Sequence, residues 1–282
     1  AIGERSTATK ANGIAIGSTA LASEINAIAM GFKSNSSGEN STAIGANSVA
    51  SKQGSIALGQ NTESSGKDSV AIGSVAKATA DNTFAAGARS NATGINAISV
   101  GTDTNSAGED AISVGTNAAA SVKNTIALGL NSKSSAENAT ALGLRANASA
   151  NDTVAIGTNA EASAINGLAL GINSKSSATN ATAFGLNSAA AGADSLALGS
   201  AAKTSDVNAI ALGSQAAASK ANTIALGTQT KAAGANAIAL GNKADASVFQ
   251  AIALGTSAKA SAADTVALGT DSIASGNSAI AL

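Results

Sequence analysis

The side chains of this sequence that could perform acid–base or metal chemistry are carboxylates. The chain has no His and no Cys, which excludes histidine bases and thiolate nucleophiles or metal ligands. Glu39, Asp68, Asp110 and Asp152 are typical of its acidic residues and recur at positions that resemble turns. Short acidic side chains are common in turns because they hydrogen-bond to nearby backbone. We therefore predict a protein that is not an enzyme and needs no cofactor.

A ladder of Asn or Asp residues is the second set of groups that could bind an ion. One of the two stands nine residues after a repeating glycine in 17 of 20 repeats. Calcium-binding β-rolls use a nine-residue Gly-Gly-x-Gly-x-Asp repeat, which is absent. One amide or carboxylate per turn is a weak site for a hard cation, so the ladder predicts turns and no metal.

Large apolar residues at variable positions are the third set. Residues one, two, four, seven and eight after the glycine vary most between repeats. If their side chains are exposed, they form candidate binding patches, because binding hot spots need apolar anchors. Alternatively, they fill the corners of coils or an interface between chains. The candidates for a ligand patch or a trimer interface are Phe32, Leu130, Leu144, Ile172, Leu186 and Phe249.

The elements that carry these residues follow a period of fourteen. Glycine recurs at every fourteenth position from Gly3 to Gly269, 20 times, without insertion or deletion. A fixed period of this kind determines the architecture. Glycine adopts positive φ at no steric cost, so we expect it to end a strand and begin a turn. Representative turn glycines are Gly17, Gly31, Gly45, Gly59, Gly73, Gly157 and Gly269.

Two short strands are expected in each repeat. The three residues before the glycine alternate large apolar, Ala, large apolar, which is a strand period. A coiled coil is excluded because its seam needs apolar residues three and four apart. The residues three to five after the glycine also alternate, with small residues flanking a mostly polar one. Asn and Asp tolerate the left-handed region and suit the second turn.

Stacking of such repeats predicts an all-β, parallel β-solenoid with 14 residues per coil. At about 4.8 Å per coil, some twenty coils would extend about 95 Å. Because the second strand supplies only small inward side chains, the first strand is expected to supply the bulk of the core. The alanine between the aliphatic pair would then face outward, while the opposite assignment stays open. The predicted core residues are Ile14, Ile16, Val70, Ile72, Ile126, Leu128, Val154 and Ile156.

Composition limits the partners of this protein. The net charge is −1, with 16 basic and 17 acidic residues, which predicts no nucleic-acid binding and no direct membrane contact from this segment. No run reaches the roughly 18 apolar residues of a membrane helix. The sequence starts and stops inside a repeat, so we expect a fragment of a longer chain. Its thin core predicts burial of a flat outer alanine face against a neighbouring chain.

The repeat resembles a known family. Ser69-Val70-Ala71-Ile72-Gly73 and Thr153-Val154-Ala155-Ile156-Gly157 are similar to the "SVAIG" repeat of YadA-like heads of trimeric autotransporter adhesins, and the resemblance covers residues 1–282 as one continuous head. It implies a left-handed β-roll in a side-by-side homotrimer at the surface of a Gram-negative bacterium. An outer-membrane anchor would lie in segments not present here.

The resemblance also implies a function. Heads of this family bind extracellular matrix proteins such as collagen, fibronectin or laminin, or promote autoaggregation, and we expect multivalent adhesion here. One alternative is a passive spacer that sets the reach of another binding domain. A more remote alternative is an ice-binding solenoid, although such surfaces carry regular outward ranks of Thr and here Thr is scattered.

Overall fold

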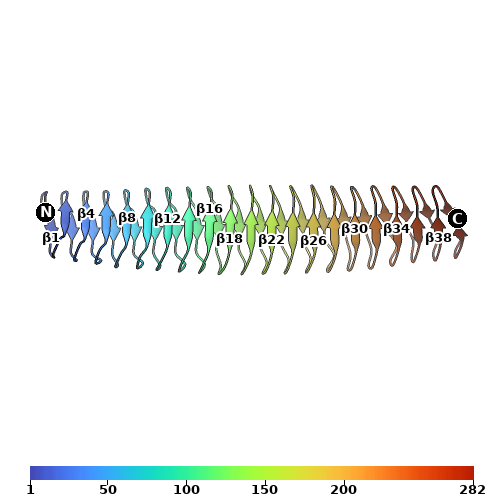
Figure 1. Ribbon diagram of the computed structural model, residues 1–282, viewed down its shortest axis with the longest axis horizontal. Coiled ribbons are helices and arrows are strands. Elements are labelled where there is room, and N and C mark those ends of the chain that lie inside the picture. Colours follow the sequence, from blue (N-terminus) through green and yellow to red (C-terminus); the bar gives the residue numbers. More distant parts are fainter. The chain divides into compact units, whose positions relative to one another are not determined.

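The computed structural model describes all 282 residues and contains two compact units, residues 1–142 and 143–282. Each unit is a parallel β-solenoid, in which one coil consists of a three-residue strand, a turn, a two-residue strand and a second turn (Figure 1). The strands account for all regular structure, so no helix is long and apolar enough to cross a membrane. That residues 1–282 form one continuous head stays a prediction.

In unit 1, the even-numbered strands stack in register to form one wall of the solenoid. Ile14 on β2 pairs with Ile28 on β4, and Ile28 pairs with Thr42 on β6. The strands of this wall are β2 (Ile14–Ile16), β4 (Ile28–Met30), β6 (Thr42–Ile44), β8 (Ile56–Leu58), β10 (Val70–Ile72), β12 (Phe84–Ala86), β14 (Ile98–Val100), β16 (Ile112–Val114), β18 (Ile126–Leu128) and β20 (Thr140–Leu142).

The odd-numbered strands of unit 1 form the facing wall. Here too each residue pairs in parallel with the residue fourteen positions later, as Lys77 on β11 does with Asn91 on β13. These strands are β1 (Thr7–Ala8), β3 (Leu21–Ala22), β5 (Asn35–Ser36), β7 (Val49–Ala50), β9 (Glu63–Ser64), β11 (Lys77–Ala78), β13 (Asn91–Ala92), β15 (Asn105–Ser106), β17 (Ala119–Ala120) and β19 (Lys133–Ser134).

Unit 2 repeats the same plan, again with parallel, in-register pairing along each wall. Its odd-numbered strands are β21 (Asn147–Ala148), β23 (Glu161–Ala162), β25 (Lys175–Ser176), β27 (Ala189–Ala190), β29 (Lys203–Thr204), β31 (Ala217–Ala218), β33 (Lys231–Ala232), β35 (Asp245–Ala246), β37 (Lys259–Ala260) and β39 (Ile273–Ala274). Its even-numbered strands are β22 (Val154–Ile156), β24 (Leu168–Leu170), β26 (Thr182–Phe184), β28 (Leu196–Leu198), β30 (Ile210–Leu212), β32 (Ile224–Leu226), β34 (Ile238–Leu240), β36 (Ile252–Leu254), β38 (Val266–Leu268) and β40 (Ile280–Ala281).

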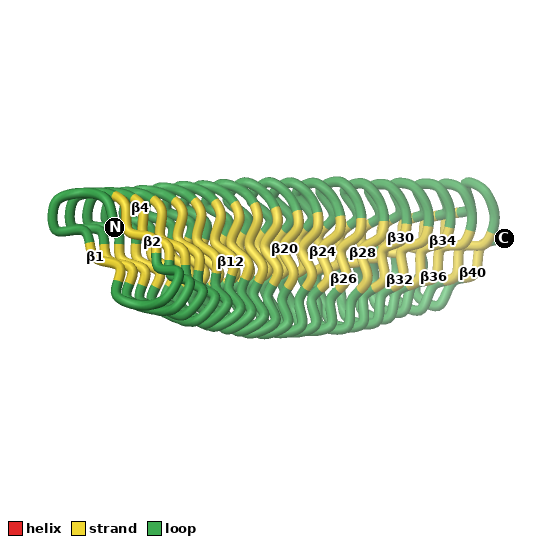
Figure 2. Tube along the Cα trace, turned by 60° about the vertical axis from the view of Figure 1, so that its left-hand side comes forward, coloured by secondary structure: helices red, strands yellow, loops and turns green.

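The turns connect the two walls and stack as loops along both edges (Figure 2). The representative turn glycines each follow an even-numbered strand with φ between +120° and +138°. A Cβ added to Gly17 would lie 2.5 Å from the carbonyl oxygen of Gly31 in the next coil. Glycine is therefore required twice over, by its backbone conformation and by the close approach of the neighbouring coil.

Two further residues per coil adopt the left-handed conformation. The Asn or Asp nine after the glycine does so, as in Asn26 with φ +59°. The residue two after the glycine does so as well, as in Val75 with φ +61°. From the sequence alone, this position is only one of those that vary between repeats. The signal was the frequent Asn there, such as Asn159, Asn173 and Asn187, because Asn tolerates this region better than most residues.

The predicted composition of the core is wrong for the single chain. The alanine in the middle of each complete even-numbered strand of unit 2, such as Ala211, is fully buried. The aliphatic residues that flank it face outward. Of the predicted core residues, Ile14, Ile72 and Ile156 are exposed, and Ile16, Val70, Ile126, Leu128 and Val154 are half-buried.

The physical reason is the short distance between the walls. The Oγ of Ser99 on β14 donates a hydrogen bond of 2.8 Å to the Oγ1 of Thr104, which precedes β15 on the opposite wall. The largest fully buried side chains of the protein are Thr and Ser. Sheets packed through ordinary side chains lie about 10 Å apart, whereas walls in contact through Ala, Ser and Thr leave no room for Ile or Leu.

Candidate functional site

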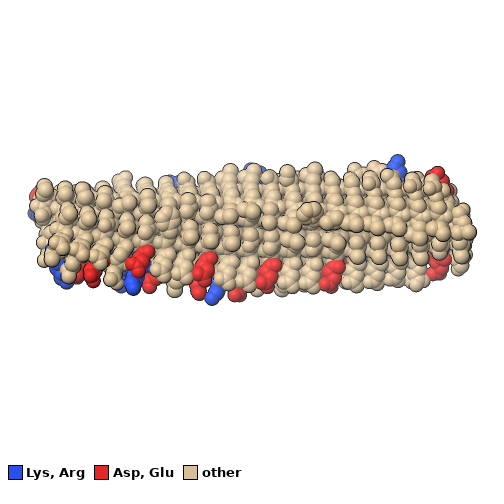
Figure 3. All heavy atoms as spheres, viewed as in Figure 1, with Lys and Arg blue, Asp and Glu red and all other residues tan.

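The outer face of the even-numbered strands is the most extensive apolar surface of each unit. We call it the aliphatic face, defined by the two side chains that flank the buried middle residue of each even-numbered strand. None of these positions carries a charged residue, and Figure 3, viewed from the side of these strands, shows no Lys, Arg, Asp or Glu over them. Exposed members in unit 2 include Ile156, Phe184, Ile210, Ile224, Leu240 and Leu268.

The predicted apolar patches lie in the turns at the margins of this face. All six side chains are exposed, by 37% to 51%, so they do not fill coil corners in the single chain. Ile172 and Leu186 occupy the same turn position in consecutive coils of unit 2, whereas Phe32 stands in unit 1 beneath the ammonium group of Lys33, 5.1 Å from the ring centre. The structure brings the first pair together, and Phe249 stands at a different turn position of unit 2. Their role in a ligand patch or a trimer interface stays a proposal.

The turn carboxylates lie apart from one another. Glu39, Asp68, Asp110 and Asp152 are exposed and stand in different coils. No three His, Cys, Asp or Glu side chains come together. The Asn/Asp ladder is bonded along its own length, as where the Nδ2 of Asn96 donates to Asp110 (2.9 Å). These groups therefore stabilise the stacking of turns.

Ion pairs also join neighbouring coils. Five of the six link residues fourteen positions apart, and all involve partly exposed side chains, so water and salt screen them and they contribute little to stability. Their main effect is to align charged side chains of neighbouring coils. The pairs are Lys10–Glu24, Lys77–Glu63, Arg89–Asp103, Lys123–Glu109 and Lys175–Glu161.

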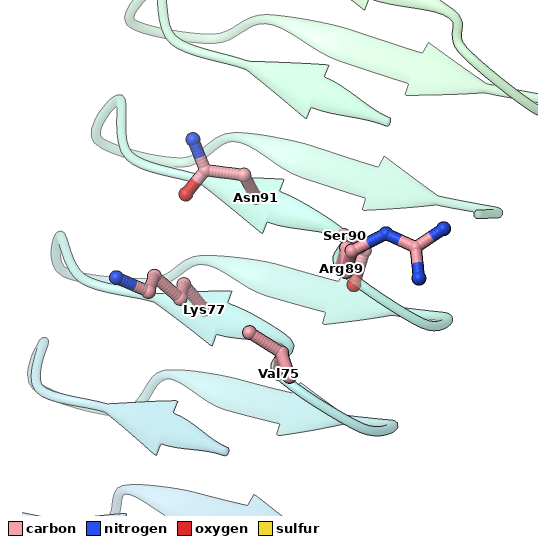
Figure 4. Close-up of a pocket in the computed structure, with 5 residues that line it drawn as sticks. All are labelled: Val75, Lys77, Arg89, Ser90 and Asn91. Carbon is pink, nitrogen blue, oxygen red and sulfur yellow. The ribbon is translucent and has the colours of Figure 1, made fainter. Parts of the chain in front are cut away.

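A shallow hollow of about 350 Å³ lies on unit 1 (Figure 4). It is lined by Val75, Lys77, Arg89, Ser90 and Asn91, which come from β11, β13 and the turns before them. Its polar side chains are already engaged: the Lys77 ammonium lies 3.8 Å from Glu63, Ser90 donates to a backbone carbonyl, and Asn91 donates to a neighbouring amide. The hollow presents no free group with which to perform chemistry.

Acid should weaken the ion pair between Arg89 and Asp103 in unit 1. Arg89 donates from Nε and Nη2 to the two carboxylate oxygens of Asp103, at 2.5 and 2.6 Å, and these hydrogen bonds, with the guanidinium charge, lower the pKa of Asp103. A lowered carboxyl pKa stabilises the fold above the ordinary value of about 3.9 and ceases to do so as the pH falls through the lowered one. Asp103→Asn should therefore slightly lower the melting temperature at neutral pH, and this difference should disappear in strong acid. In an Arg89→Gln background, Asp103→Asn should have no pH-dependent effect on the melting temperature. If such an effect remained, the stabilisation would not come from the ion pair with Arg89.

Known proteins similar to this chain include an adhesin domain of solved structure. A solved structure described as the collagen-binding domain of the Yersinia adhesin YadA matches with 17% sequence identity over 68% of this chain and 69% of that chain, at a TM-score of 0.21. A search of curated proteins found no match.

The model of the YadA head domain repeat, which describes two copies of the repeat, matches this chain in a series of segments from residue 1 to residue 282, some of which overlap. The matched residues are 1–20, 22–48, 36–62, 50–76, 64–90, 78–104, 92–118, 106–132, 134–160, 162–188, 190–216, 218–244, 249–272 and 260–282. The chain therefore belongs to the YadA head domain repeat family.

Proposed function

We propose that this chain is part of the head of a bacterial surface adhesin, in which the aliphatic face joins three copies side by side and the remaining outer surface attaches to host matrix or to other cells. The observation that carries the proposal is the aliphatic face itself. Monomeric proteins rarely expose contiguous apolar patches beyond a few hundred Å², and here aliphatic pairs recur in most coils of both units.

The division of surfaces supports this arrangement. The aliphatic face is apolar and uncharged, which suits a permanent interface between identical chains. The odd-numbered strands instead present Lys, Glu, Asn and Ala outward, which suits a surface in water. Repeated faces on three chains would give many weak, equivalent sites, and linked sites gain avidity without any new contact. Attachment to the outer membrane of a Gram-negative bacterium would be provided by other segments of the full-length protein.

Charge on the aliphatic face should prevent self-association. Leu240 is 41% exposed on β34, so Leu240→Lys should leave the single chain folded but place a desolvated ammonium in the interface. By light scattering, we expect the wild-type chain at three times 26.5 kDa and the variant at a lower mass.

The matched control places the same residue on the opposite wall. Ala217→Lys lies between Lys203 and Lys231 on the outer face of the odd-numbered strands and should keep the wild-type mass. A wild-type chain that is monomeric at micromolar concentration, or equal losses in the two variants, would contradict an interface on the aliphatic face.

Adhesion is tested separately, with immobilised collagen, fibronectin and laminin. Saturable binding supports the adhesin, and clumping of beads coated with the chain alone supports autoaggregation. A passive spacer is the second candidate, favoured by the scarcity of anchor residues: the chain has 4 Phe, no Trp and no Tyr, and binding hot spots are rich in Trp, Tyr and Arg. Failure to bind in both assays would support the spacer.

A further inference from the structure

We propose that a row of lysines on the outer wall of unit 2 binds an extended acidic polysaccharide. The row consists of Lys175, Lys203, Lys231 and Lys259, which we call the lysine row. The proposal rests on the adhesive function proposed above and names one class of ligand for it.

The geometry of the wall makes the row straight and regular. The four lysines stand on β25, β29, β33 and β37 at the same register position, and β27, β31 and β35 intervene. With about 4.8 Å between neighbouring strands, successive ammonium groups recur at about 10 Å. Because each strand pairs in register with the next, this spacing is fixed by the backbone and does not depend on loops.

The charges of the row are largely available. All four lysines are exposed, and Lys203, Lys231 and Lys259 form no ion pair. Lys175 is paired, with its Nζ 3.0 Å from Glu161. The strands between the lysines contribute Ala189 and Ala217, which leave the surface flat, and Asp245, whose carboxylate accepts a hydrogen bond from Ser247.

The second outward position of this wall adds neutral hydrogen-bonding groups. Ser177, Ser205 and Ser261 stand two residues after lysines of the row and are exposed. Hydroxyl groups and small methyl groups beside widely spaced cations complement a sugar chain, whose rings carry many hydroxyls and few charges. A polymer with one acidic group per disaccharide presents its anions once per two sugar rings, which matches a cation on every second coil.

Other polyanions fit the row less well. Each strand of duplex DNA carries a charge about every 3.4 Å, a density that the row does not match. Single-stranded nucleic acid is usually bound by stacking its bases on aromatic side chains, and the row has no aromatic residue. An anionic membrane surface selects clusters of several Lys or Arg with apolar anchors, whereas this row is one residue wide. The sparse, regular charge therefore favours the polysaccharide.

The test compares two pairs of lysines in the same unit. Lys203→Ala with Lys231→Ala interrupts the row with the residue that already occupies the intervening strands at 189 and 217. Lys220→Ala with Lys243→Ala removes two exposed turn lysines that lie off the row. Binding of the full chain to surface-bound hyaluronan, which has one carboxylate per disaccharide, should weaken roughly tenfold in the first variant, as expected for the loss of two exposed ion pairs. It should be unchanged in the second, and neutral dextran should not bind.

Removing the interrupting carboxylate gives a test in the opposite direction. Asp245→Ala continues the alternation of Lys and Ala and should strengthen hyaluronan binding. Equal losses in the two double variants, no gain from Asp245→Ala, or equal binding of an oligothymidine strand would each overturn the proposal. If the chain binds matrix proteins but not hyaluronan, this inference fails while the adhesin stands; if it binds neither, both fail.

Discussion

Gly73→Asn should lower the free energy of unfolding by about 3 kcal/mol or more, the upper range for a strongly disfavoured backbone conformation plus a steric clash. Gly73 has φ +127°, far from the left-handed region near +57° that Asn can adopt. A Cβ there would also lie 2.5 Å from the carbonyl oxygen of Gly87 in the next coil. That oxygen belongs to a stacked backbone and cannot move without disturbing the coils on both sides.

The same substitution at Gly54 provides the control. Gly54 has φ +67° and occupies the position that Asn40 and Asp68 hold in the coils before and after it, with φ +58° and +53°. The close contacts of a Cβ at Gly54 are with the flexible carboxylate end of Asp68, and the nearest backbone atom, the Cα of Asp68, lies at an ordinary contact distance of 3.6 Å. Gly54→Asn should therefore change stability by no more than about 0.5 kcal/mol. Both variants can be compared by urea denaturation, with hydrogen exchange to locate the loss; equal effects would show that the two glycines do not differ as described.

Ala211→Leu should destabilise unit 2 by about 3 kcal/mol, at the upper end of the range for overpacking. Ala211 lies in the middle of β30 with no exposed surface, and β30 packs between the equally buried alanines of β28 and β32. The opposite wall contributes side chains of the same small size, so a Leu has no space to enter. Relief would require the walls to separate, which would break the hydrogen bonds of the turns.

The neighbouring odd-numbered strand supplies the matched control. Ala217 on β31 points outward between Lys203 and Lys231 and is half-buried. Ala217→Leu should stay within about 0.5 kcal/mol of wild type, the usual range for surface changes. The urea denaturation midpoints of the Ala211→Leu and Ala217→Leu variants test this difference in stability. A tolerated Leu at 211 would mean that the interior is wider than the buried alanines indicate.

The two predictions share one cause. A coil of 14 residues with two short strands and two tight turns brings the walls so close that a small residue is required in the middle of each even-numbered strand and a glycine in the turn that follows it. The large side chains are then displaced to the outside, where the single chain cannot cover them. The exposed aliphatic face therefore follows from the tightness of the coil, whereas the sequence alone favours an outer alanine face.

The repeat by itself determined most of the architecture. The glycine period predicted the coil, and the alternation before Gly17 and its equivalents predicted a strand. The Asn or Asp nine residues after the glycine, such as Asn26, predicted the second turn. Each of these depends on local backbone preference, which is encoded within a few residues. The turn glycines and the absence of helix-forming periodicity could accordingly be recognised without coordinates.

The tertiary structure decided which side of each strand faces inward. Alternation such as Ile14-Ala15-Ile16 states that the two faces of a strand differ, but it does not state which face is buried. That choice depends on the distance to the opposite wall, which residues such as Ser99 and Thr104 set by contact across the coil. The alignment of Lys203 with Lys231 depends likewise on the stacking of separate coils. Local sequence therefore specified the strands and turns, and the close approach of the two walls specified which side chains were left to meet a partner.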